Sequence, residues 1–485
     1  MKPCIIILLT LLSLTSRGQD LGTPVVAWPE SLQEVYGKYK YEPISDRRFK
    51  HEDVLVALLV QKNLFEINEV AKSNEGRSIN LVSAGEGEID VLLWSQMHGN
   101  ETTATMAMLD IFNWLSATED GYDSYRNIIL SKLKLHFVPM LNPDGAQRFT
   151  RRNTQGIDIN RDALRQQTPE GRVLKNLRDS LDADWGFNLH DQGRSTTAAS
   201  KPATLSFLAP AYDVERNVNE KREDAMQLIA SMNNLIQKVV PGQVGRYWDD
   251  FEPRAFGDNI QKWGTRTILI ESGGEYHDRE KQLIREYNFL ALIHAMHSIA
   301  TKSYEDFSES DYLSIPANSR GMSDVILRNV MLSGELGTHL TDIAINFTEV
   351  QDETYARYYL KASIEDLGDL STSNGYIVYD LEGLRVEEGQ QYSKAIVTLS
   401  DLTDDQLNAL LKEGYTDYVV KKPNFFDQNK FIKIVRSGND NQVQLGNNPS
   451  LLFYEGDQLR YLLINGLLID SKWTTEEIRA AKKRL

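Results

Sequence analysis

The chain has 485 residues, and its 53 Lys and Arg residues against 69 Asp and Glu residues leave a net charge of −16. This acidic balance argues against a nucleic-acid phosphate backbone as the main partner, so we expect no nucleic-acid binding. The hydrophobic fraction of 41% is ordinary for a folded protein and excludes collagen-like, low-complexity and wholly disordered chains. At about 100–200 residues per domain, the length predicts two or three domains.

Residues 1–19 are interpreted as a signal peptide, because an early lysine precedes the apolar run Ile5–Leu14 and a polar stretch with cleavage between Ser16 and Asp20. The run is shorter than the ~20 residues that cross a bilayer. We therefore expect an exported protein, periplasmic or secreted, without a transmembrane segment after cleavage. The lone cysteine, Cys4, lies in this segment. The mature protein then has no disulfide, and His, Asp or Glu must hold any metal.

Residues 20–305 form the first predicted domain after this segment. From about Ser45 to Ser303, short apolar runs alternate with helix-length amphipathic stretches. The alternation predicts an α/β fold with a mixed central sheet flanked by helices. The expected strands are Val91–Met97, Leu135–Leu141 and Thr267–Ile270, and the expected helices include Thr102–Leu115 and Glu223–Val239.

The composition and the hydrophobic pattern of the sequence change after the first domain. Residues 306–322 are polar and show no period, which indicates a linker. Residues 323–485 hold many short runs rich in β-branched and aromatic residues, separated by Gly, Asn and Asp, as in a β-rich accessory domain. We expect one helix inside it at Thr403–Lys412 and a closing helix in TTEEIRAAKKRL that begins with a capping box. The sequence does not indicate a partner for this domain.

Three apolar strand-like runs end in residues that suit a metal site. His98 and Glu101 follow the first run, in WSQMHGNET, and His190 ends another run, in FNLHDQG. Strand ends in open α/β sheets are where binding crevices form, and catalytic zinc commonly takes three His or carboxylate ligands plus a water. The alternative is a loop without a metal and a structural histidine. Glu271 ends the third run, in RTILIESGGE, either as a general base or as a helix-capping or salt-bridged carboxylate.

The segment after the run at 135–141 is rich in arginine. The turn Asn142–Gly145 is followed by Arg148, Arg151, Arg152 and Arg161 in a chain that is acidic overall. A local surplus of guanidinium groups suggests that an anion is bound there, and a carboxylate fits their planar fork. The alternative is a solvated basic loop.

In this order, the motifs HGNE, NPDG, DINR, NLHDQ and ILIESGG resemble those of the zinc carboxypeptidase family, the carboxypeptidase A-like metallopeptidases, over roughly residues 45–300. The resemblance implies one zinc ion held by His98, Glu101 and His190, with Glu271 as the catalytic glutamate. It also implies that Asp158 orients the first histidine.

By the same resemblance, Arg151 polarises the scissile carbonyl, since it stands nine residues before Asn160. Arg152 is the alternative if the loop is shifted by one residue. Asn160 and Arg161 would bind the terminal carboxylate of the substrate. Tyr247 matches the family's mobile tyrosine only approximately in spacing. Arg254 and Asp258 are both candidates for the residue of the specificity pocket.

The resemblance implies a zinc-dependent metallocarboxypeptidase, a hydrolase whose partner is a peptide with a free C-terminal carboxylate. A related zinc amidase or deacylase, acting on acylated amino acids or cell-wall peptides, is the alternative. A catalytically inactive binding module is a further one, which the complete set of ligands and Glu271 disfavours.

Overall fold

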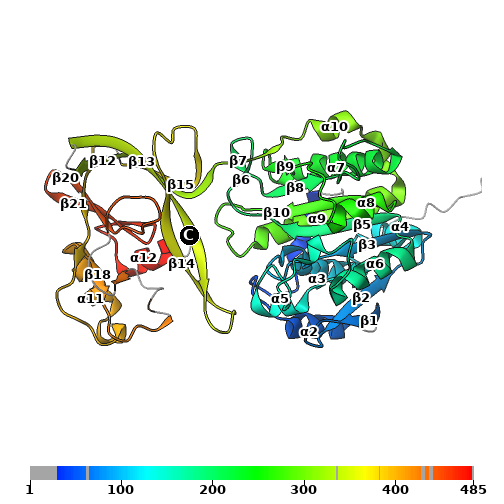
Figure 1. Ribbon diagram of the computed structural model, residues 1–485, viewed down its shortest axis with the longest axis horizontal. Helices are drawn as coiled ribbons and strands as arrows, with labels where there is room; N and C mark the ends of the chain where they lie inside the picture. Colours follow the sequence, from blue (N-terminus) through cyan, green and yellow to red (C-terminus); the bar gives the residue numbers. More distant parts are fainter. Residues whose placement is uncertain are drawn as a thin grey trace, which may run out of the picture.

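The computed structural model describes residues 30–61, 65–334, 337–381, 383–425, 427, 432–435 and 441–482. Residues 1–19, predicted as a signal peptide, lie outside this part of the chain. In the described ranges no helix is long and apolar enough to cross a membrane. Figure 1 shows an α/β half built from the first part of the chain beside a β-rich half built from the last part.

An eight-stranded mixed sheet forms the centre of the first half, as the alternation of apolar runs predicted. Its middle strands are parallel, whereas the strands on either side include antiparallel pairs. In spatial order the strands are β1 (Glu66–Lys72), β2 (Ser78–Ala84), β4 (Leu133–Val138), β3 (Ile89–Trp94), β5 (Trp185–Asp191), β10 (Arg266–Ser272), β8 (Leu205–Leu208) and β9 (Val244–Arg246).

Helices cover both faces of this sheet, and each face has its own apolar cluster. The larger cluster draws on α2 (His51–Gln61), α3 (Thr103–Ser116), α4 (Asp123–Lys132), α7 (Glu220–Val239) and α9 (Gln282–Thr301). The smaller one draws on α6 (Pro169–Leu181) and α8 (Phe256–Lys262). Short helices complete the half, namely α1 (Glu30–Val35), α5 (Pro143–Arg148) and α10 (Glu309–Leu313).

Two predicted strands end earlier than their apolar runs. The chain leaves β3 after Trp94 because Gln96 adopts a left-handed conformation with φ of 48°. β4 ends at Val138, directly before Pro139, which has no N–H for a sheet hydrogen bond. The remaining apolar residues, including Met97 and Leu141, are buried in the turns beyond the strands. Both turns therefore begin a few residues before the polar side chains that gather at this edge of the sheet.

The segment predicted as a linker, 306–322, contains regular structure. It holds α10 and the strand β11 (Asn318–Arg320), and β12 already begins at Met322. β11 pairs with β6 (Thr196–Ala198), which in turn pairs with β7 (Lys201–Pro202). This small sheet ties the connection between the two halves to the loop that follows β5.

A second large sheet dominates the last part of the chain, in agreement with the predicted β-rich domain. In spatial order it contains β14 (Tyr358–Gly368), β13 (Gly337–Gln351), β12 (Met322–Gly334), β16 (Arg385–Glu388), β20 (Leu451–Glu455), β21 (Gln458–Ile464) and β22 (Leu467–Asp470), with β15 (Asn374–Asp380) also paired to β12. A small parallel sheet packs beside it, made of β17 (Gln390–Gln391), β18 (Tyr415–Val419) and β19 (Lys433–Val435) with the helices α11 (Asp404–Lys412) and α12 (Thr475–Lys482). The predicted capping box opens α12, since Glu477 N donates to Thr474 Oγ1 and Thr474 N donates to Glu477 Oε2.

Candidate active site

Three predicted metal ligands converge at one edge of the central sheet. His98 follows β3 by four residues, Glu101 lies just before α3, and His190 lies near the end of β5, the neighbour of β3. All three side chains are buried. The Nδ1 atoms of the two histidines are 3.2 Å apart, and each lies 2.7 Å from an oxygen of the Glu101 carboxylate. The local turns after two adjacent strands thus bring residues 92 positions apart into contact.

This donor set fits a zinc ion. Zn²⁺ prefers imidazole nitrogen and carboxylate oxygen, and two ligand atoms at about 2.1 Å from a tetrahedral ion lie roughly 3.4 Å apart. Among the described residues, these three form the one group of His, Cys, Asp and Glu side chains whose ligand atoms lie within 4.8 Å of one another. Two imidazole nitrogens that face each other at 3.2 Å cannot both carry a proton, so at least one of them presents a lone pair to a cation.

Asp158 controls the orientation of His98. His98 Nε2 donates to Asp158 Oδ1 at 3.0 Å, which keeps the proton on Nε2 and leaves Nδ1 free for a metal. Burial alone would raise the pKa of Asp158, but its contacts with His98 and Arg151 lower the pKa below the ordinary value. The carboxylate therefore stays ionised at neutral pH and holds the imidazole in this tautomer.

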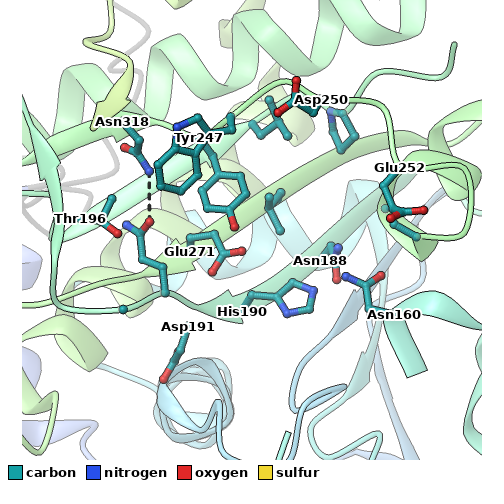
Figure 2. A pocket seen from close by; sticks show the side chains of 18 of the residues that line it. Asn160, Asn188, His190, Asp191, Thr196, Tyr247, Asp250, Glu252, Glu271 and Asn318 are labelled. Carbon is teal, nitrogen blue, oxygen red and sulfur yellow. Dashed lines mark hydrogen bonds between the residues drawn. The ribbon is translucent and has the colours of Figure 1, made fainter. Parts of the chain in front are cut away.

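Glu271 faces the three ligands from the adjacent strand. It pairs in register with His190, because β10 runs parallel to β5, and its carboxyl is buried. Burial, together with the negative charges of Glu101 and Asp191, raises the pKa of Glu271 well above the ordinary value. In Figure 2 the carboxyl of Glu271 points to the space between His190 and the hydroxyl of Tyr247. A carboxyl with a raised pKa at this point is suited to accept and return a proton.

Two arginines reach the same space from the loop after β4. Arg151 donates from Nε to Asp158 Oδ2 at 3.0 Å, and its Nη1 lies 3.3 Å from Glu101 Oε1. Arg161 pairs through Nε with the carboxylate of Glu252 at 3.3 Å. Both side chains remain partly exposed and line one cavity of about 1000 Å³ together with the metal ligands and Glu271. The cavity therefore offers two cationic groups to an anionic ligand.

Comparison with known proteins agrees with this geometry. Residues 54–223 match the family described as zinc carboxypeptidase. This part of the chain belongs to the zinc carboxypeptidase family. A probable carboxypeptidase 2 of Arthroderma benhamiae is 21% identical over 219 residues, which are 42% of this chain and 38% of that protein. An uncharacterized protein of Zymomonas mobilis is 28% identical over 145 residues, 29% of this chain and 37% of that protein. The chain thus spans under two fifths of the length of these two relatives.

Solved structures of carboxypeptidases are also similar to the chain. A metallo-carboxypeptidase from Burkholderia cenocepacia is 16% identical, with 53% of this chain and 70% of that chain covered and a TM-score of 0.44. A metallo-carboxypeptidase from Pseudomonas aeruginosa, in complex with (2-guanidinoethylmercapto)succinic acid, is 16% identical at the same coverage, with a TM-score of 0.42.

The remaining residues predicted for the carboxypeptidase site fall into two groups. Asn160 and Tyr247 line the cavity, and Asn160 Oδ1 accepts a hydrogen bond from Phe256 N at 2.9 Å. Arg152, the alternative to Arg151, is exposed and donates to Gly156 O outside the cavity. The structure thus places Arg151, and not Arg152, beside the metal ligands.

The two candidates for the specificity pocket also separate. Asp258, in the first turn of α8, lines the cavity, and burial raises its pKa to about 7. Arg254 lies outside the cavity lining, and its exposed side chain pairs with Glu252. The short turn before α8 directs Arg254 to solvent and Asp258 inward.

The sequence analysis missed several residues of the site. Glu252 pairs with Arg161, and Asn318 of β11 donates to Gln192 Oε1 at 3.0 Å, the contact drawn dashed in Figure 2. Lys281 Nζ lies 3.1 Å from Asp191 Oδ2, next to the ligand His190. The acidic run DDFE at 249–252 could have indicated an anionic wall, whereas the other contacts depend on segments that only the folded chain brings together.

Proposed function

We propose that this protein is an exported, zinc-dependent metallocarboxypeptidase that hydrolyses the C-terminal peptide bond of peptides. The observation that carries the proposal is one cavity lined by a His–Glu–His metal group, a buried carboxyl and two arginines. A metallopeptidase site needs a metal, a base and an oxyanion partner, and the second arginine adds a place for a terminal carboxylate.

The chemistry divides among the residues as follows. His98, Glu101 and His190 would hold a zinc ion, which when bound would supply Lewis-acid polarisation of a carbonyl and of a water molecule. Glu271 accepts the proton of the attacking water and returns it to the amine that leaves. Its raised pKa suits both transfers, because the carboxyl can hold the proton between them. The guanidinium of Arg151 stabilises negative charge that develops on the scissile carbonyl oxygen.

Arg161 accounts for cleavage at the C-terminus. Its guanidinium already binds a carboxylate, that of Glu252, and it lies in the cavity beside Asn160. A substrate carboxylate can replace Glu252 in the same type of contact, with a bidentate geometry that Arg favours. Binding of this group would place the last peptide bond, and no other, near the metal group.

Peptides of one sequence with a free and an amidated C-terminus test this proposal, together with a zinc measurement on the same protein. We expect stoichiometric zinc and cleavage of the free peptide with release of its last residue, and at least a ~100-fold lower kcat/KM for the amide. Equal rates on both peptides would instead support the zinc amidase or deacylase alternative. A purified protein without zinc that cannot be reconstituted would overturn the proposal.

Export rests on the composition of residues 1–19, where a basic start, an apolar run and a polar end follow one another. Expression of the full chain in a secreting bacterial host tests it. We expect the exported fraction to begin between Ser16 and Asp20 by mass spectrometry of its N-terminal peptide. An uncleaved protein confined to the cytoplasm would contradict this part of the proposal.

A further inference from the structure

The two loops that continue from the catalytic strands both contact the β-rich domain. The first, residues 191–195, follows His190 at the end of β5, and the second, residues 272–281, follows Glu271 at the end of β10. Figure 1 shows β14 and β15 on the side of the β-rich domain that faces the α/β half. The contacts between the halves therefore concern the segments that carry the proposed catalytic residues.

Asp324 of β12 joins these two loops. Its Oδ1 accepts from Arg194 Nε on the first loop and from Arg279 Nη2 on the second, each at 3.1 Å. Its Oδ2 accepts from Phe347 N on β13 at 2.8 Å, so the carboxylate is itself held by the sheet. Asp324 is 8% exposed. One buried carboxylate of the β-rich domain thus neutralises two guanidinium groups that would otherwise repel each other.

A tyrosine of the neighbouring strand adds to this contact. The hydroxyl of Tyr376 on β15 donates to Arg194 O at 2.9 Å, and its ring lies 3.8 Å from the Arg194 guanidinium. The same hydroxyl lies close over Gly274, where an added Cβ would meet it at 2.0 Å. Tyr376 therefore fills the space between the two loops, and position 274 has room only for glycine.

The second loop contacts both the β-rich domain and the strand ends that carry Glu271 and His190. Glu280 accepts from Arg47 N at 3.1 Å and from the Tyr358 hydroxyl of β14, which fixes its position against the β-rich domain. The next residue, Lys281, contacts the ends of the two catalytic strands: its Nζ donates to Ser272 O at 2.7 Å and pairs with Asp191 at 3.1 Å. Ser272 and Asp191 directly follow Glu271 and His190 in the chain.

We propose that the β-rich domain is a working part of the active site, and that Asp324 is the positioning residue that holds together the two loops continuing from His190 and Glu271. The inference rests on the proposed carboxypeptidase function and deepens it. Loss of the Asp324 charge would let the loops that carry Arg194 and Arg279 move apart. Because a misplacement of about 1 Å can cost about 100-fold in rate, such a movement would lower kcat more than it raises KM.

The test compares Asp324→Asn with Asp342→Asn in the full-length protein. Asp342 of β13 is a matched control, because it accepts from Arg328 at 2.8 Å within the same sheet, and its side chain is 13% exposed against 10% for Asp324. We expect Asp324→Asn to lower kcat at least ~10-fold with KM within ~3-fold. We also expect faster zinc release to a chelator and faster amide hydrogen exchange in 190–195 and 272–281. Asp342→Asn should leave all four quantities near those of the unaltered protein.

The outcomes separate this inference from the proposed function. If no peptide is cleaved but zinc release and hydrogen exchange still rise only in Asp324→Asn, the positioning role stands and the carboxypeptidase proposal fails. Unchanged values in a folded Asp324→Asn, or equal effects of both substitutions, would overturn the positioning role. If Asp324→Asn does not fold, Tyr376→Phe, which removes only the hydroxyl bonded to Arg194 O, must shift the same readouts in the same direction.

Discussion

Glu271 is a buried carboxyl that faces three metal-ligand side chains, and its pKa is raised by burial and by the charges of Glu101 and Asp191. Replacing it with Gln keeps the shape but removes the proton acceptor. We expect Glu271→Gln to lower kcat by about 100-fold to 10,000-fold while zinc remains bound, measured by peptide hydrolysis and metal analysis. Glu275→Gln, a buried carboxyl on the same loop that hydrogen-bonds Thr204 and Gln243, should retain most activity. Full activity of Glu271→Gln would rule out its role as the base.

Asp158 acts on the metal through His98, whose Nε2 donates to it at 3.0 Å. Asp158→Asn would present an amide that no longer fixes the tautomer, so we expect the zinc Kd to rise by about 10-fold to 100-fold in a chelator competition. Asp162→Asn is the matched control, since among the described residues the Asp162 carboxylate accepts from the segment 167–168 and not from His98. A zinc Kd that does not change in Asp158→Asn would contradict the orienting role.

The raised pKa of Asp258 predicts that substrate preference changes with pH. Burial raises its pKa to about 7, so the carboxyl is neutral below that pH and negative above it. For peptides that end in Lys or Arg, KM should therefore fall as the pH rises from 6 to 8. Peptides that end in Leu should lack this trend, and Asp258→Asn should abolish it for the basic peptides. The same pH dependence in both peptide series would assign the titration to another group.

At the scale of elements, the turns after β3 and β4 pack backbone against backbone. Gly99 lies between the ligands His98 and Glu101, and a Cβ at this position would lie 2.0 Å from the carbonyl carbon of Gly145. Gly99→Ala must push the two turns apart, at a cost of about 1–3 kcal/mol in the free energy of unfolding and with weaker zinc binding. Denaturant unfolding and chelator competition measure both quantities. Gly37→Ala, where no heavy atom lies within 4 Å, should change neither.

The strand ends explain why so much of the site was predictable from the sequence. Strands β3, β5 and β10 are parallel neighbours, so the residues at their carboxyl ends meet at one edge. His98, His190 and Glu271 each follow or end an apolar run, and their positions are therefore fixed locally. The helix–strand alternation likewise predicted the mixed sheet. Exact strand ends were less predictable, because Gln96 and Pro139 interrupt the runs by backbone conformation and not by polarity.

At the scale of the whole molecule, a second ionic cluster holds the two halves together away from the metal group. Glu349 of β13 accepts from Arg48 Nη2 at 2.7 Å and from Arg47 Nη2 at 2.5 Å. Glu349→Gln would remove the carboxylate charge that both guanidinium groups share and leave Arg48 with only neutral acceptors, those of Gln351 and Tyr355. Removal of one partner from a buried ion pair costs roughly 3 kcal/mol. We expect a lower Tm in calorimetry and a transition that splits into two, one for each half. Glu353→Gln, on the exposed turn nearby, should leave the single transition intact.

The sequence by itself indicated the class of metal site, because a chain whose lone cysteine is Cys4 offers His, Asp and Glu as ligands elsewhere, and the order of its motifs indicated the zinc carboxypeptidase family. It also predicted the α/β half and the β-rich half, since strand and helix periods are local properties. Only the tertiary structure placed Arg151 inside the cavity and Arg152 and Arg254 outside it, because one or two residues of loop decide which way a side chain points.

The relation between the two halves was likewise decided by tertiary structure. Asp324 lies 130 residues beyond Arg194, and neither residue carries a motif that links it to the other. Such a contact forms because two loops and a sheet edge meet in space, and its energy comes from charges that are buried together only after folding. By our proposal, the β-rich domain belongs in this way to the active site of the neighbouring half.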